Sequence, residues 1–190
     1  MRIVWLTVLL VIVVVVLVVY YGPKIQVPEE KAVNFVMDDL ANKYPGGDYS
    51  ILSMELKKSD KGENYYDIKA KATIGLDTPC PKRIHVYYNY PEQGFVVHPP
   101  DVVTDNCLYC TNQPNCIIMF DEEAIIASHT IGGTEAVTAY ISEFDAQPKV
   151  SFDDANDVWT VTWDSPAADR TVTVKISSGN ALESVEQAEK

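Results

Sequence analysis

The sequence predicts an α+β protein in which an N-terminal transmembrane helix is followed by two modules, each a helix plus an antiparallel sheet. Three observations support this prediction. An uncharged apolar run fills residues 3–23, a helical apolar pattern opens each half of the remaining chain, and alternating stretches follow each helix. The expected boundaries are residues 1–23 for the anchor, 24–117 for the first module and 118–190 for the second.

The apolar run IVWLTVLLVIVVVVLVVYYGP is long enough to cross a bilayer, which takes roughly 20 apolar residues. A cleaved signal peptide is the alternative, but its apolar core is only about 7 to 15 residues long and ends at a small-x-small site. This run instead ends at Tyr20 and Tyr21, which suit a membrane interface, as does Trp5 near the other end. Arg2 favours a cytoplasmic N-terminus. We therefore expect a single-pass protein of the cell membrane, held in lipid by this helix, with its C-terminal domain outside the cytoplasm.

The first module is expected to open with a helix from Pro28 to Tyr44. Pro28 suits a first helical position, and Glu29 and Glu30 favour the positive end of the helix dipole. The sequence Pro45-Gly46-Gly47 ends the helix. Alternating apolar residues then predict strands over 52–56, 66–74 and 84–90.

The same order recurs in the second module. Asp121 is expected to cap a helix with Glu122 and Glu123 in its first turn, and a second helical stretch covers 137–144. Alternating stretches at 150–152, 159–163 and 172–176 predict the strands that follow. We expect Gly179 to release the chain into a charged tail.

A family resemblance follows from the second module. Its sequence DEEAIIASHTIGG, then a strand with Trp159-Thr160-Val161, then TVTVKISSGNAL, is similar to PepSY domains, over about residues 121–186. The first repeat, from Pro28 to about Val103, resembles a looser PepSY or cystatin-like module. The resemblance implies a helix-plus-sheet fold and a role in restraining or regulating peptidases. No peptidase domain follows in the sequence, and the family offers no catalytic residue to carry over.

The chain has four cysteines, Cys80, Cys107, Cys110 and Cys116. An even number outside the cytoplasm predicts disulfides, with three possible pairings, each bond contributing roughly 2 to 4 kcal/mol. A zinc site of four thiolates normally needs two Cys-x-x-Cys knuckles, of which one is present. A redox Cys-x-x-Cys normally starts a helix, whereas turn-forming residues follow Cys110. We expect disulfides that staple the first module and set its angle to the second. Metal binding, with His98 as a conceivable extra ligand, and redox activity stay open as alternatives.

The net charge and the sequence motifs disfavour several classes of partner and activity. A net charge of -12 disfavours nucleic acid as a partner. The sequence holds no phosphate-binding loop, nucleophile elbow or zincin helix, so we expect no enzymatic activity, no cofactor and no metal site. Tyr87, Tyr88 and Tyr90 on one predicted strand indicate a candidate binding face.

The sequence therefore predicts an extracytoplasmic protein-binding module. Its expected partner is a protein, with a peptidase or an envelope complex as the classes considered. One alternative is a redox or metal-binding protein that uses the four cysteines. Another is a structural subunit of a surface assembly.

Overall fold

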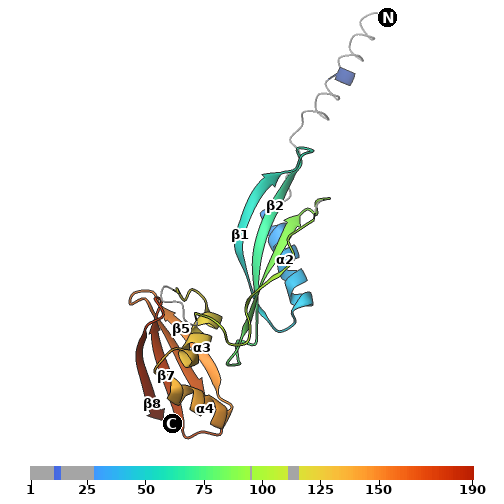
Figure 1. Ribbon diagram of the computed structural model, residues 1–190. Coiled ribbons are helices and arrows are strands. Elements are labelled where there is room, and N and C mark those ends of the chain that lie inside the picture. Colours follow the sequence, from blue (N-terminus) through green and yellow to red (C-terminus); the bar gives the residue numbers. More distant parts are fainter. Residues whose placement is uncertain (1–10, 14–27, 95, 111–115) are drawn as a thin grey trace, which may run out of the picture.

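The computed structural model describes residues 11–13, 28–94, 96–110 and 116–190, and it contains two four-stranded antiparallel sheets with few helices (Figure 1). Most of the predicted membrane anchor lies outside these residues. Within the described ranges, no helix has both the length and the apolar character that a membrane crossing requires. The fold class that began with a transmembrane helix, and the single-pass location in the cell membrane, are therefore corrected. The helices at 29–43, 121–130 and 135–144 are 10 to 15 residues long, and each carries acidic residues in its first turn.

The first sheet follows the chain in the order β1 (Asp48–Lys58), β2 (Asn64–Ile74), β3 (Lys82–Tyr90) and β4 (Asp101–Thr104). Helix α2 (Glu29–Lys43) lies on one face of this sheet (Figure 1). The apolar residues of the helix recur every fourth position because one side of it is buried. The core between helix and sheet consists of Ala32, Val36, Leu40, Tyr66, Ile68, Ala70, Ala72, Ile84, Val86 and Tyr88.

The second sheet has the order β5 (Gln147–Asp153), β6 (Val158–Asp164), β7 (Arg170–Ser177) and β8 (Leu182–Glu189). The predicted charged tail after Gly179 is wrong, because these residues form β8 and pair with β7. Strand β8 has one half-buried side with Leu182 and Val185, while its glutamates face solvent. It is an edge strand, and charged side chains are normal there.

Helices α3 (Asp121–Thr130) and α4 (Glu135–Phe144) belong to the second module. The core of this module is built around Trp159, Val161, Trp163, Val172, Val174 and Ile176 from the sheet, with Ala124, Ile125, Ala127, Val137 and Tyr140 from the helices. In α3, every residue from Glu122 to Ser128 is buried. Figure 1 shows α3 on the side of the second module that faces the first.

The prediction of disulfide bonds is confirmed, with the pairs Cys80–Cys107 and Cys110–Cys116. Cys80 lies in the loop between β2 and β3, and Cys107 follows β4, so the first bond closes the end of the first sheet. Cys110 and Cys116 instead contact the core of the second module. The two bonds therefore stand on opposite sides of the junction between the modules.

Candidate functional site at the junction of the modules

A cluster of buried charges joins the two modules. The Nη1 atom of Arg83 lies 2.6 Å from Oε1 of Glu123 and 3.0 Å from Oε1 of Glu122. The Nζ atom of Lys71 lies 3.4 Å from Oε2 of Glu122. The four residues expose between 0% and 6% of their surface. Two cations from the first module thus balance two carboxylates from the second, away from water.

Strand alternation positions the two cations. Side chains of neighbouring residues in a strand point to opposite faces. Because Ala70, Ala72 and Ile84 face α2, Lys71 and Arg83 point to the opposite face of the first sheet. Helix α3 brings its N-terminal turn to the end of that face, and its two glutamates meet the cations there.

Further contacts satisfy the carboxylates. The hydroxyl of Thr73 donates to Oε2 of Glu122 over 3.4 Å. The backbone N–H groups of Met119 and Phe120 donate to Oε2 of Glu123, over 2.7 Å and 3.2 Å. Glu123 therefore caps the helix, whereas the sequence analysis assigned that role to Asp121. A buried ion pair is tolerated only with such additional partners, and removing one member leaves a costly unpaired charge.

The ring of Phe120 completes the cluster. The Lys71 ammonium lies 4.8 Å from its centroid and the Arg83 guanidinium 4.6 Å, both within cation–π range. Sequence reasoning missed this cluster, since it placed Glu122 and Glu123 only in the first turn of a helix and considered no partner for them. The one available signal was that α3 lacks an apolar stripe, which is typical of a helix buried on all sides.

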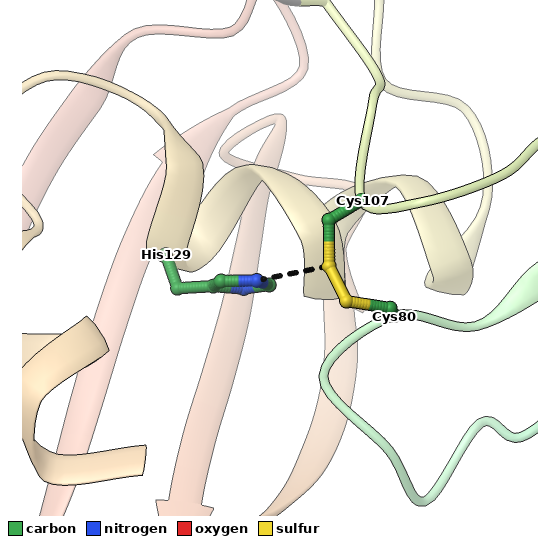
Figure 2. Close-up of side chains that lie close together, drawn as sticks. All are labelled: Cys80, Cys107 and His129. Atoms are coloured by element: carbon green, nitrogen blue, oxygen red, sulfur yellow. Dashed lines mark hydrogen bonds between the residues drawn. A yellow bond between two sulfur atoms is a disulfide. The ribbon is translucent and has the colours of Figure 1, made fainter. Parts of the chain in front are cut away.

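A second group lies at the other end of α3, where His129 in the last turn faces the Cys80–Cys107 disulfide (Figure 2). The Nε2 atom of His129 is 3.6 Å from Sγ of Cys107. The Nδ1 atom lies 2.9 Å from the carbonyl oxygen of Ile125. A carbonyl only accepts, so Nδ1 carries the proton and Nε2 presents its lone pair to the sulfur. Burial lowers the pKa of His129, which is therefore neutral at pH 7.

Metal binding was an open alternative for the cysteines. The sulfurs of Cys80 and Cys107 and a ring nitrogen of His129 lie within 4.8 Å of one another. Both sulfurs are bonded in the disulfide, and a metal ligand must be a thiolate. His98, which we considered as a ligand, is instead exposed and has its ring 4.8 Å from that of Tyr87.

The three tyrosines of the predicted binding face lie on two faces of the first sheet. Tyr88 is buried and donates its hydroxyl to Asp39 of α2 over 2.9 Å. Burial and this hydrogen bond raise the pKa of Tyr88. Tyr90 stacks on Phe35 of α2, with ring centroids 4.9 Å apart. Tyr87 lies on the opposite face, where its hydroxyl donates to Asp101 over 2.9 Å. The structure therefore brings Tyr88 and Tyr90 together under α2 and separates Tyr87 from them.

Residues 105–120, here named the connecting segment, link the modules and are described except for 111–115. Three large apolar side chains on this segment are exposed, at 65% for Leu108, 60% for Ile117 and 66% for Met119. Between the last two, Ile118 is 1% exposed, and its carbonyl accepts a hydrogen bond from the indole of Trp159. At residues 117–119 the chain is therefore anchored through its central residue, while the side chains on either side face solvent.

Sequence reasoning did not identify the connecting segment as a surface, because it considered only the cysteines there.

No family model, curated protein or solved structure matches the chain. The resemblance to PepSY domains thus rests on the quoted sequence motifs and stays a prediction.

Proposed function

We propose that the chain is a protein-binding module whose contact surface is the connecting segment. The observation that carries this proposal is the exposure of Leu108, Ile117 and Met119 on one short, anchored stretch of chain. Exposed large apolar side chains that gather in one place are typical of protein–protein contact sites. Phe152 adds to this surface, since it is 39% exposed and stacks on Trp159.

The anchoring of the segment supports a binding role. Cys110 and Ile118 are buried in the core of the second module, and the N–H of Ile118 donates to the carbonyl of Ser178 over 2.7 Å. The hydroxyl of Tyr109 donates to the carbonyl of Ile117 over 2.8 Å. A surface that is ordered before binding loses less conformational entropy when a partner docks.

The junction cluster supports the same role. Arg83 and Lys71 on one side and Glu122 and Glu123 on the other restrain how the modules are oriented around the segment. A partner would therefore meet a fixed surface at the described residues of the segment, 105–110 and 116–120. The net charge of -12 favours a partner whose own contact surface is neutral or basic. The PepSY resemblance makes a peptidase the first partner class to test.

Site-specific crosslinking in cells of the source organism tests the proposal. A photo-crosslinking residue is placed at position 119 in one full-length variant and at position 56 in another. Leu56 is a matched control because it is a large apolar residue, 49% exposed, on β1 of the first sheet. We expect a discrete crosslinked protein from position 119 and none of that mass from position 56.

A second substitution tests whether the crosslink depends on the apolar side chains of the segment. Adding Ile117→Asp to the position 119 variant should reduce the crosslinked band at least about tenfold, since a charge in an apolar contact is costly. Mass spectrometry of the band identifies the partner. Equal crosslinking from positions 119 and 56, or a band that Ile117→Asp leaves unchanged, contradicts the proposal.

A further inference from the structure

We propose that the Cys80–Cys107 disulfide is redox-active, with Cys80 as the sulfur that external thiols attack and His129 as the base that activates Cys107. This inference goes beyond protein binding and rests on a different group of residues. The substrates are small thiols and dithiols and their disulfides.

The two cysteines differ in their exposure to solvent. Cys80 is exposed in the loop between β2 and β3, whereas Cys107 is half-buried beside α3. Thiol–disulfide exchange depends on which sulfur an incoming thiolate can reach. An external thiolate therefore reaches Sγ of Cys80, and Cys107 is the leaving group.

His129 is placed to serve the inner sulfur. Its Nε2 lone pair is directed at Sγ of Cys107 over 3.6 Å, because the Nδ1 proton is held by the carbonyl of Ile125. Figure 2 shows the imidazole approaching the disulfide from the Cys107 side. The ring is itself held, with its centroid 5.6 Å from that of Trp163 in an edge contact. An imidazole oriented by a third group next to a sulfur is the general arrangement of an activated cysteine.

The chemistry balances without a cofactor. In reduction, a thiolate RS⁻ attacks Cys80, the S–S bond breaks, and Cys107 leaves as a thiolate that takes up a proton. A second RS⁻ attacks the mixed disulfide, releasing RSSR and the Cys80 thiolate, so two electrons pass from two thiols to the protein. In oxidation by RSSR, the Cys80 thiolate attacks one sulfur of RSSR, the S–S bond of RSSR breaks, RS⁻ leaves, and a mixed disulfide remains on Cys80. His129 then accepts the Cys107 thiol proton, and Cys107 attacks Cys80 and expels RS⁻.

The thiolate fraction of Cys107 limits how much His129 can accelerate the attack of this cysteine. A cysteine with a pKa near 8.5 is only about 3% thiolate at pH 7, so complete activation accelerates its attack by at most about 30-fold. The closure rate of the Cys110–Cys116 bond serves as the reference for the Cys80–Cys107 bond in the same chain. Cys110 is 8% exposed and lies within the core of the second module.

The test follows disulfide formation in the reduced full chain after addition of oxidised glutathione at pH 7, with alkylation and mass spectrometry at each time point. In His129→Gln, we expect Cys80–Cys107 to close about tenfold more slowly than in the wild type, while Cys110–Cys116 closes at the wild-type rate. His98→Gln is the matched control and should change neither rate. An unchanged Cys80–Cys107 rate in His129→Gln, or an equal slowing of both bonds, overturns the proposal.

A second measurement does not depend on His129. With oxidised glutathione, Cys107→Ser should accumulate the mixed disulfide on Cys80, because the thiol that resolves it in the wild type is gone. Cys80→Ser should form it on Cys107 at least about tenfold more slowly, because that sulfur is less accessible. Equal or reversed rates in these two variants would show that Cys80 is not the entry point, and the proposed roles would be wrong.

Discussion

The two modules use their helices differently. Both sheets are antiparallel with four strands in sequence order. Helix α2 buries Ala32, Val36 and Leu40, one side of a helix that serves a single sheet. Helix α3 buries seven consecutive residues, Glu122 to Ser128, including two carboxylates. The difference shows that α3 belongs to both modules, because its two buried glutamates find partners in the first module, while Ala124, Ile125 and Ala127 pack in the core of the second.

The largest expected effect comes from breaking the shared cluster. Arg83→Met leaves Glu122 and Glu123 with Lys71 alone, so a buried negative charge is unpaired. We expect a loss of about 3 to 5 kcal/mol in the free energy of unfolding, measured by denaturant titration. The control is Lys43→Met, which breaks the partly exposed Lys43–Asp39 pair of α2 and should cost at most about 1 kcal/mol. Equal losses in the two variants would contradict the distinction between α2 and α3.

The next largest expected effect is the difference in stability that the two disulfides contribute. The Cys80–Cys107 bond spans a sequence separation of 27 and the Cys110–Cys116 bond one of 6. Chain entropy gives roughly 3.5 kcal/mol for the first and roughly 2 kcal/mol for the second. Thermal unfolding of the two double serine variants should therefore rank Cys80→Ser/Cys107→Ser as less stable. The reverse order would show that packing of Cys110 in the second core outweighs loop length.

Lowering the pH should weaken the first module through His85. Burial, followed by the charges of Lys69 and Arg83, lowers the pKa of His85 to about 4. The unfolded chain therefore binds a proton below pH 6.5 that the folded chain does not, and stability falls as the pH drops from 6.5 towards 4. Because His85 is partly exposed, we expect a loss of about 1 kcal/mol over this range.

Urea titrations at pH 6.5 and 4.5 measure this loss. His85→Gln should show a smaller decrease in stability between the two pH values than the wild type. The exposed His98 provides the control variant, His98→Gln, which should follow the wild type. A His85→Gln chain with the full wild-type decrease would exclude this histidine as the cause.

The smallest expected effect is the difference in stability loss between two substitutions in β3, Tyr88→Phe and Tyr87→Phe. Tyr88→Phe removes the buried hydrogen bond to Asp39 and should destabilise the chain by about 1 kcal/mol. Tyr87→Phe removes an exposed hydrogen bond to Asp101 and should cost less than about 0.5 kcal/mol. Denaturant midpoints compare the two, and a larger loss for Tyr87 would mean that the outer face of the sheet is the more constrained one.

Local patterns in the sequence indicate individual elements of this fold. The helical spacing after Pro28 corresponds to α2, and alternation corresponds to β2, β3, β6 and β7, because the apolar side chains of each element are buried on one face. Strands β4 and β8 were missed for physical reasons. The first has only four residues, and the second is an edge strand whose exposed side is acidic.

The candidate site was less predictable than the elements. Alternation shows that Lys71 and Arg83 share a face, but nothing local indicates that α3 will cover it. The proximity of His129 to Cys107 likewise depends on residues 22 positions apart that meet only after the modules have packed. The predicted tyrosine face included two side chains that α2 covers, because alternation alone does not say which face of a sheet is buried.

The central claim is that α3 joins the modules through its buried charges, and a double-mutant cycle tests it most directly. The cycle compares the unfolding free energies of the wild type, Arg83→Met, Glu122→Gln and the double variant, with Lys175→Met and Glu186→Gln as a control cycle on the exposed pair between β7 and β8. If Arg83 and Glu122 stabilise each other across the junction, the double variant loses about 2 kcal/mol less than the sum of the single losses, while the control pair adds within about 0.5 kcal/mol. Additive losses at Arg83 and Glu122 would contradict the claim.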